Sequence, residues 1–323
     1  MSDQPVKHRR SGLLASAPPS AALEITRSHV TAVSAVEQRG GTVVSSYSAE
    51  PLPPSAVEPG LNAVNVHDAG ALTAAIKAAL EKLSPRPRRI ALVLPDTVGK
   101  VSLLRFEKVP AKLQDLDQLI RWQVRKAAPF RIEDAQVSWC HGAPLTGGGR
   151  EYVVTIARRD IIAGYEAACQ AADAHAGLVD LASFNLINAV LASGQTSGDW
   201  LLVNVAADYA TLAVVRGSDL VFFRNRGSNG PAELADLVHQ TAMYHEDRLG
   251  GGGFARVIVT GASLRGPEQA AWLRRSIEER LGSRVETLDF RSAATVRDRI
   301  SVGPELLDAL APSIGILLRE RVA

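Results

Sequence analysis

The sequence contains little cysteine, few aromatic residues and no long apolar run. Its 323 residues include two cysteines, Cys140 and Cys169, without CxxC spacing. This count excludes a disulfide framework and indicates a reducing compartment. No run of about 18 apolar residues occurs, so we expect no helix that spans a membrane. The formal net charge of +2 is too small to indicate a nucleic-acid-binding surface.

The common motifs of catalytic and metal-binding sites are also missing. The glycine runs at 147–149 and 250–253 are not followed by Lys-Ser or Lys-Thr, so neither is a P-loop. His239 and His245 lie on one predicted helix, but they lack the i, i+4 spacing of two metal ligands on one face. The sequence has no GxSxG and no HExxH. We therefore expect no metal site and no catalytic residue.

Two segments with the same strand–turn–strand layout lie half a chain apart, at 23–47 and 201–226. Both are rich in β-branched residues that are interrupted by Gly, Ser and Asp, which is typical of strands joined by tight turns. Two pairs of residues align at the same spacing along the chain: Glu24 with Asn204, and Thr31 with Thr211. A unit that recurs in this way predicts two related halves facing each other across a cleft.

Strands alternate with helices along both halves, which predicts two α/β domains with mixed sheets. We expect a disordered leader at 1–20, a first domain at 21–198 and a second domain at 199–323, with a small subdomain at about 103–158 inserted into the first. Apolar periodicity predicts helices at 69–83, 116–127, 160–175, 182–192, 231–249 and 267–281, and a last helix with Pro312 in its first turn. Short apolar runs predict strands at 90–94, 101–106, 135–140, 152–157, 256–260 and 285–290.

Residues with known capping preferences predict where two of these helices begin and end. Asp68 and Asp160 are the expected N-caps, because a carboxylate accepts hydrogen bonds from the free N–H groups of a first turn. Gly177 is the expected stop of the helix that begins at Asp160. The basic runs at 7–10 and 86–89 are typical of solvated surface, and contact with anionic lipid is the alternative.

The most specific motifs lie in the inserted block, at 106–110 (FEKVP), 120–130 (IRWQVRKAAPF) and 133–134 (ED), and a further one lies at 177–189. With them, the chain resembles the PilM family of type IV pilus assembly proteins, of the actin-like ATPase superfold, over about 22–318. The resemblance implies an actin-like (ribonuclease H-like) two-domain α/β fold. It also implies an inserted small subdomain in the first half and a reduced lid subdomain in the second.

The nucleotide motifs of the family are degenerate in this chain. The first phosphate motif, Asp-Ile-Gly-Ser-Ser-Ser-x-Lys, is replaced by EITRSHVT at 24–31. A phosphate-cradling turn uses glycine so that backbone N–H groups can approach the oxygens, whereas Thr26 supplies a β-branched side chain that fits a positive φ poorly. Thr31 also lacks the charge of the lysine.

The second phosphate motif has lost more of its chemistry than the first. Asn204 stands where the family has a Mg²⁺-side aspartate, Ala206 where it has a glycine, and Asp208 adds negative charge at the phosphate position. Gly261-Ala262 replaces the adenosine motif Gly-Gly, and only 227–254 remain where the lid subdomain would be. The resemblance thus implies a vestigial nucleotide cleft, and its residues would be Glu24, Ser28, Asn204, Thr211 and Gly261. We expect no cofactor, and ATP with Mg²⁺ is the alternative.

The resemblance implies a non-catalytic cytoplasmic scaffold, peripheral to the inner membrane, that binds the N-terminal peptide of a PilN-like bitopic partner and contacts other pilus assembly proteins. The resemblance implies a peptide groove between the first large subdomain and the inserted one, walled by the 101–106 strand and the 116–127 helix. Its residues would be Leu103, Leu104, Phe106, Ile120, Trp122 and Val124. Trp122 either packs on a neighbouring subdomain or belongs to the contact surface, where Trp and Arg are over-represented. The alternatives are an active actin-fold ATPase of pilus assembly and the cytoplasmic scaffold of a type II secretion system.

Overall fold

The computed structural model describes residues 19–39, 41–145, 147–194, 197–227, 230–296 and 302–322. Most of the expected leader, residues 1–18, lies outside the described residues. Among those described, no helix is long and apolar enough to cross a membrane.

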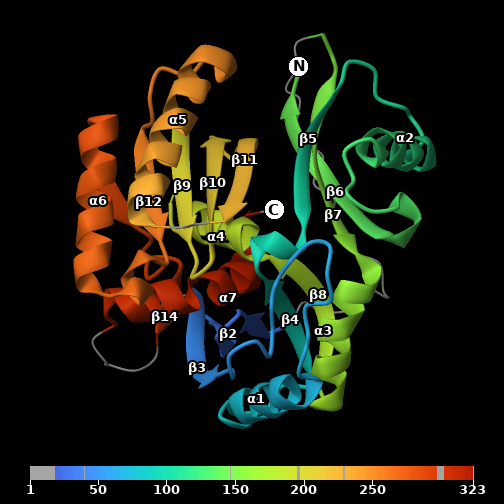
Figure 1. The fold of residues 1–323 in the computed structure, drawn as a ribbon, viewed down its shortest axis with the longest axis vertical. Helices are drawn as coiled ribbons and strands as arrows, with labels where there is room; N and C mark the ends of the chain where they lie inside the picture. Colours follow the sequence, from blue (N-terminus) through green and yellow to red (C-terminus); the bar gives the residue numbers. More distant parts are fainter. Residues whose placement is uncertain are drawn as a thin grey trace.

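Three sheets organise the molecule (Figure 1). The first has six strands in the order β14 (Ala294–Val296), β3 (Gly41–Pro51), β2 (His29–Gln38), β1 (Ala21–Ile25), β4 (Arg89–Leu94) and β8 (His175–Leu181). The second has five strands in the order β11 (Asp219–Gly227), β10 (Tyr209–Arg216), β9 (Asp199–Val205), β12 (Arg256–Thr260) and β13 (Val285–Thr287). The third has three strands in the order β5 (Lys100–Phe106), β7 (Arg150–Arg158) and β6 (Ala135–Pro144).

Seven α-helices and three short 3-10 helices complete the described part of the chain. The α-helices are α1 (Ala69–Glu81), α2 (Leu113–Arg125), α3 (Arg159–Ala171), α4 (Ala182–Ala192), α5 (Pro231–Leu249), α6 (Pro267–Leu281) and α7 (Pro304–Val322). The 3-10 helices are η1 (Asp96–Val98), η2 (Ile132–Asp134) and η3 (Ala262–Arg265).

The two large sheets repeat one arrangement, as the aligned hairpins predicted. Each begins with an antiparallel meander whose first strand also pairs in parallel with a later strand, β1 with β4 and β9 with β12. Glu24 lies opposite Thr31 in the first meander, and Asn204 lies opposite Thr211 in the second. The third sheet and α2 form a separate unit to the right in Figure 1.

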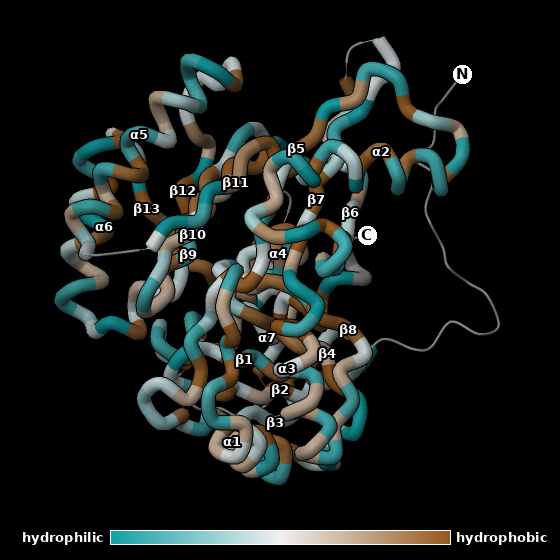
Figure 2. Tube along the Cα trace, turned by 45° about the vertical axis from the view of Figure 1, so that its right-hand side comes forward, coloured by the Kyte–Doolittle hydropathy of each residue, from teal (hydrophilic) through white to brown (hydrophobic). Residues whose placement is uncertain are grey.

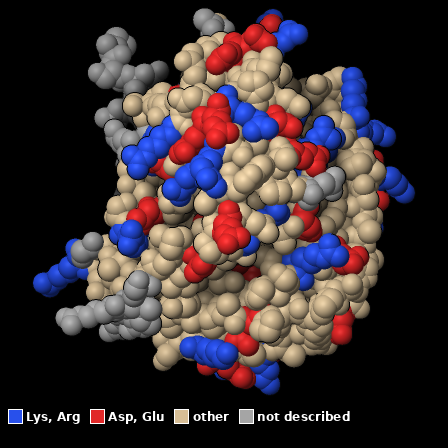
Figure 3. All heavy atoms as spheres, turned by 60° about the vertical axis from the view of Figure 1, so that its left-hand side comes forward, with Lys and Arg blue, Asp and Glu red and all other residues tan. Residues whose placement is uncertain are grey.

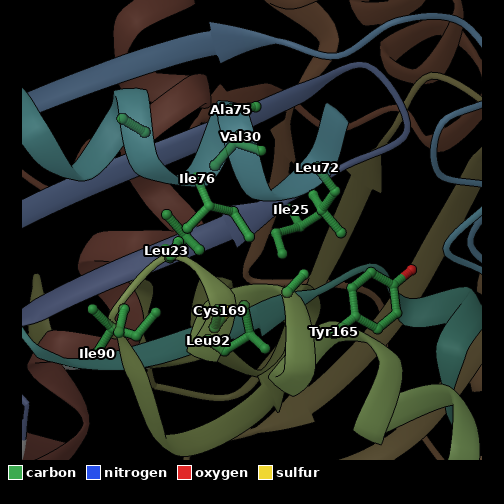
Figure 4. Close-up of a cluster of buried hydrophobic side chains, with 14 of the residues drawn as sticks. Leu23, Ile25, Val30, Leu72, Ala75, Ile76, Ile90, Leu92, Tyr165 and Cys169 are labelled. Carbon is green, nitrogen blue, oxygen red and sulfur yellow. The ribbon is translucent and has the colours of Figure 1, made fainter. Parts of the chain in front are cut away.

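Buried apolar side chains form one core in each of the three units and a further core between the two halves. Side chains of β1, β4, α1 and α3 make the first core, including Leu23, Ile76, Leu92 and Tyr165 (Figure 4). Along the tube in Figure 2, hydrophobic residues follow the strands, while the outer turns of α5 and α6 are mostly hydrophilic. The core between the halves joins α4 and α7 to Trp200 of β9, which is fully buried.

Most predicted helices are confirmed, and Asp68 caps α1 by accepting a hydrogen bond from the N–H of Ala71. The predicted boundaries of the 160–175 helix are wrong. Asp160 lies inside the first turn of α3, and the helix ends at Ala171, before Asp173 adopts a left-handed φ of 57°. Gly177 lies in β8, at a register shift against β4, and a Cβ there would be 2.6 Å from Nε of Arg89, so the Arg89 side chain would have to move.

The end of the chain also differs from the prediction. α7 begins at Pro304 and continues through Pro312, which lies within the helix rather than in its first turn. Burial of Leu310, Ala311 and Ile314 on either side of Pro312 offsets the loss of one helical hydrogen bond. Strand β13 ends three residues earlier than expected, and β14 was not predicted.

The C-terminal elements pack on the first domain although they follow the second in sequence. β14 pairs in parallel with β3, and α7 packs against α4 and the strands of the first sheet. A boundary at 199–323 therefore does not describe the packing of β14 and α7. The halves are joined both by the chain and by this return of its end to the first sheet.

The close crossing of α4 and α7 generates a prediction about stability. A Cβ on Gly315 would lie 1.8 Å from the carbonyl oxygen of Asn185. We expect Gly315→Ala to lower the free energy of unfolding by about 2 kcal/mol, because two helix backbones would have to separate. The measurement is urea unfolding followed by circular dichroism.

The matched control is Gly164→Ala in α3, where the nearest atom to a new Cβ, Cγ2 of Val66, is 3.8 Å away. That variant should be as stable as the wild type or more stable by up to about 1 kcal/mol, since alanine favours helix more than glycine does. Equal stability of the two variants would contradict the packing described for α4 and α7.

Candidate functional site

The carboxylate of Asp96 lies at the centre of the cleft between the two meanders. Asp96 follows β4 directly, begins η1 and is fully buried. Its side chain accepts hydrogen bonds from the N–H and the hydroxyl of Ser183, from Nδ2 of Asn204 (3.2 Å) and from Oγ1 of Thr211 (2.7 Å). Donors from α4, β9 and β10 therefore converge on one carboxylate from the first half.

Local structure explains why these donors meet. Asn204 and Thr211 face each other across β9 and β10, so both side chains project from the same side of the sheet. Ser183 lies in the first turn of α4, where its backbone N–H has no partner within the helix. Asp96 also donates a hydrogen bond to the second half. Its backbone N–H donates to the hydroxyl of Tyr209 in β10 (3.2 Å).

Burial raises the pKa of three side chains at the cleft, those of Asp96, Glu24 and Tyr209. Burial raises the pKa of Asp96, while the hydrogen bonds from Ser183, Thr211 and Asn204 oppose that rise. Glu24 is half-buried, and burial together with the nearby Asp96 carboxylate raises its pKa from 4.5 to about 8. Burial beside the same carboxylate raises the pKa of Tyr209 well above its ordinary value.

In the first turn, at 26–28 between β1 and β2, the side chain of Thr26 forms hydrogen bonds with the backbone of the turn. Oγ1 of Thr26 accepts hydrogen bonds from the N–H groups of His29 (3.0 Å) and Ser28 (3.4 Å), and it donates one to the carbonyl of His29 (3.0 Å). Thr26 does not adopt a positive φ, so its β-branched side chain causes no strain of the kind expected from the sequence. The amides that would cradle a phosphate in such a turn are held by a side chain of the turn itself.

The second turn, at 206–208 between β9 and β10, is held by Arg265, and Arg27 lies beside it. Arg265 of η3 donates to the carbonyls of Ala206 and Ala207, and the guanidinium of Arg27 lies 4.0 Å from the carboxylate of Asp208. Gly261 has a φ of +80°, and a Cβ there would be 2.2 Å from the carbonyl oxygen of Val205. The Asp208 charge at the expected phosphate position thus has a cation from the opposite turn beside it.

The structure brings together only some of the expected cleft residues. Asn204 and Thr211 meet at Asp96, with Glu24 near them. Ser28 lies in the exposed first turn, where its hydroxyl is 2.9 Å from Nδ1 of His29. Among the residues that the structure describes, no group of three His, Cys, Asp or Glu side chains is placed to hold a metal ion.

Asp96 and Ser183 were missed by sequence reasoning. The available signal was an aspartate directly after the continuous apolar strand β4, because ligand and cleft residues in α/β folds gather where strands end. Ser183 lies inside a segment, 177–189, that resembles the family, but its position beside Asp96 depends on tertiary packing.

The two walls expected for the peptide groove, the 101–106 strand and the 116–127 helix, belong to one packed unit. Helix α2 lies directly on the third sheet, so Ile120 and Val124 are buried in that core, and Leu104 and Phe106 pack against it. Leu103 faces the opposite side and packs on the core between the halves. Trp122 is 57% exposed, and Nζ of Lys126 lies 4.7 Å from its ring centroid.

A hollow does occur where the inserted unit meets the start of α3. It has a volume of about 630 Å³, and Phe130, Arg131 and Asp134 line one side of it. Arg158 and Arg159 line the other side and donate to the carbonyls of Asn62 and Ala135 respectively. The lining thus combines the Phe130 ring with three guanidinium groups and the carboxylates of Asp134 and Asp160, and Arg158 is paired with Asp160.

The related halves, the cleft between them and the inserted third sheet define an actin-like two-domain protein, as the resemblance implied. The family model described as type IV pilus assembly protein PilM matches residues 22–248. The chain therefore belongs to the family of type IV pilus assembly protein PilM.

A solved PilM-PilN type IV pilus biogenesis complex is similar to this chain with a TM-score of 0.79 and 19% identity, over 94% of this chain and 99% of that chain. A protein of actin-like ATPase fold from Bacteroides thetaiotaomicron has a TM-score of 0.49 and 10% identity, over 83% and 89% of the two chains. The ethanolamine utilization protein EutJ from Carboxydothermus hydrogenoformans has a TM-score of 0.47 and 11% identity, over 94% and 90%. No curated protein sequence matches the chain.

The raised pKa of Glu24 predicts a pH-dependent stability. Between pH 4.5 and about 8 the unfolded chain has lost the Glu24 proton while the folded protein keeps it. Ionisation therefore favours the unfolded state, by up to about 1.4 kcal/mol per pH unit in this range. We expect Glu24→Gln to raise the free energy of unfolding relative to the wild type, by an amount that grows from pH 5 to pH 8 and is constant above.

Urea unfolding at a series of pH values measures this difference. Ser45→Ala is the control, because the hydroxyl it removes donates to the backbone carbonyl of Ser34 (3.2 Å), and its difference from the wild type should not vary with pH. A Glu24→Gln effect that is the same at pH 5 and pH 8 would contradict the burial of this carboxyl group.

Proposed function

We propose that this protein is a scaffold for type IV pilus assembly at the cytoplasmic face of the inner membrane and that it does not hydrolyse nucleotide. Its partner is a PilN-like membrane protein, whose N-terminal segment binds beside the inserted unit. The observation that carries the proposal is a contrast between two sites. The cleft is filled by the chain's own hydrogen-bonding groups, whereas the hollow at Phe130 is open.

The chemistry of the cleft supports the absence of catalysis. Phosphoryl transfer requires a positioned metal and donors that are free to meet the transferred phosphate. Here Thr26 holds the amides of the first turn, Arg265 holds the carbonyls of the second, and Asn204 binds Asp96. A nucleotide would have to break several of these contacts to enter.

The hollow between the inserted unit and α3 supports the partner site. Phe130 offers an apolar surface to a partner side chain, and Arg131 is largely exposed, with a side chain 78% accessible. Aromatic and arginine side chains contribute strongly to protein interfaces because they bury large areas and make directional hydrogen bonds. The solved PilM-PilN complex with the same fold makes a PilN-like protein the first partner to test.

The charge distribution offers no support for a nucleic-acid partner. On the face shown in Figure 3, acidic and basic side chains are mixed rather than gathered by sign. This mixing agrees with the formal net charge of +2. A nucleic-acid-binding face would present a continuous basic surface.

The proposal predicts direct binding of the N-terminal peptide of the PilN-like protein from the same organism. Titration by fluorescence anisotropy should give saturable binding to the wild type. Phe130→Ala and Arg131→Glu should each weaken the affinity by about tenfold, since each removes a main contact in the hollow. Trp122→Ala measured alongside tests whether the exposed Trp122 belongs to the same contact surface.

Trp272→Ala on α6 is the matched control, because Trp272 is also exposed (40%) but lies in the second domain, far along the chain from the hollow. Its affinity should equal that of the wild type. Absence of binding at high micromolar peptide, or full affinity in both hollow variants, would count against the proposed site.

A further inference from the structure

The outer face of helix α2 carries an exposed tryptophan. Leu116, Ile120 and Val124 are buried against the third sheet, so the apolar stripe of the helix is already covered. Trp122 lies two residues from both Ile120 and Val124, and in a helix of about 3.6 residues per turn this spacing places it on the opposite side. The Trp122 side chain is 57% exposed. In Figure 1, α2 lies on the side of the third sheet that points away from the second domain.

Positive charge gathers at the C-terminal end of α2. Arg125 and Lys126 are exposed, and neither forms an ion pair in the part of the chain that the structure describes. Nζ of Lys126 lies 4.7 Å from the ring centroid of Trp122, which is one helical turn earlier. Lys100 of β5 donates from Nζ to the carbonyl of Ala127, just beyond the helix. Three cations therefore lie at the end of the helix that carries Trp122.

The acidic side chains of this region do not neutralise those cations. Helix α2 contains two acidic residues, Asp115 and Asp117. Asp117 pairs with Arg121 at 2.7 Å, and Asp115 lies in the first turn, roughly two turns before Trp122. Beyond the helix, Glu133 lies 3.8 Å from Arg131. The C-terminal end of α2 thus keeps a surplus of positive charge.

The surface of an anionic lipid bilayer fits this combination of side chains. Tryptophan prefers the headgroup layer, because its ring is apolar and its N–H group donates a hydrogen bond. Lysine and arginine extend their charged groups along an apolar surface toward the phosphates, and each is attracted by the negative potential of an anionic membrane. The face lies on the outside of the molecule, where a flat surface can reach it (Figure 1).

We infer that the outer face of α2 formed by Trp122, Arg125 and Lys126 contacts the anionic headgroups of a lipid bilayer. The ring of Trp122 enters the headgroup layer, and Arg125 and Lys126 pair with phosphate oxygens beside it. A contact of this size is reversible, so it orients the protein on the membrane rather than anchoring it. The inference goes beyond the proposed scaffold role, because it requires neither the PilN-like partner nor the hollow at Phe130.

Sedimentation with lipid vesicles tests the inference. The probe is a vesicle of equimolar phosphatidylcholine and phosphatidylglycerol, mixed with the full-length protein. The wild type should sediment with these vesicles to an extent that falls as salt rises, and it should not sediment with vesicles of phosphatidylcholine alone. Arg125→Glu/Lys126→Glu should weaken vesicle binding at least about tenfold, because repulsion replaces attraction at two positions. Trp122→Ala should weaken it several-fold without any change of charge.

Two matched controls lie on α6. Arg274→Glu/Arg275→Glu makes the same charge change at two exposed positions, and Trp272→Ala removes another exposed tryptophan. Both variants should sediment with the vesicles as the wild type does. Circular dichroism should show that all variants are folded.

A third control separates this face from the hollow at Phe130. Phe130→Ala should weaken binding of the PilN-like peptide and leave vesicle binding unchanged, whereas Trp122→Ala should do the reverse. The two readouts therefore distinguish a failure of the lipid contact from a failure of the proposed partner site.

Several results would overturn the inference. They are no sedimentation with the anionic vesicles, equal sedimentation with phosphatidylcholine alone, and an equal loss in the α6 variants. A Trp122→Ala variant that loses peptide binding and keeps vesicle binding would also overturn it, because the face would then belong to the contact surface for the partner.

Discussion

The burial of the Asp96 carboxylate is the constraint on which the arrangement of the two halves depends. A buried carboxylate is costly unless donors surround it, and here those donors come from α4, β9 and β10. The hydrogen bonds that satisfy Asp96 therefore also fix the distance and angle between the sheets. Asn225 extends the group by donating to Oγ1 of Thr211 (2.8 Å). Protein side chains from both halves thus meet at the centre of the cleft.

Side chains of the protein also contact the polar groups of the two turns at the cleft. Thr26 and Arg265 satisfy the backbone of the two turns, and Arg27 places a cation beside Asp208. The Arg27–Asp208 pair is partly exposed at 4.0 Å and contributes less than about 1 kcal/mol, so it adjusts the cleft rather than holding it. The return of β14 and α7 to the first domain adds a large apolar contact between the halves.

Much of the fold could be predicted from the sequence because its signals are local. The meanders, the cap at Asp68 and the helices with one apolar stripe each depend on neighbouring residues. β8 and β14 could not be predicted, because β8 contains Gly177 and β14 has three residues, and both exist through pairing with distant strands. The candidate site divides in the same way. Asn204 and Thr211 follow from the repeat, whereas Asp96 and Ser183 meet through tertiary packing. The peptide groove stays a prediction, and the apolar stripe of α2 that was expected to line it packs on the third sheet.

Calorimetric titration of the protein with Mg-ATP tests the central claim most directly, because it asks whether the cleft still admits a nucleotide. The account predicts no heat of binding up to about 1 mM, which corresponds to a binding free energy weaker than about 4 kcal/mol. Micromolar binding that Asn204→Ala abolishes and Trp272→Ala, on the outer helix α6, leaves intact would contradict it. That result would mean that the hydrogen bonds around Asp96 open to admit the ligand.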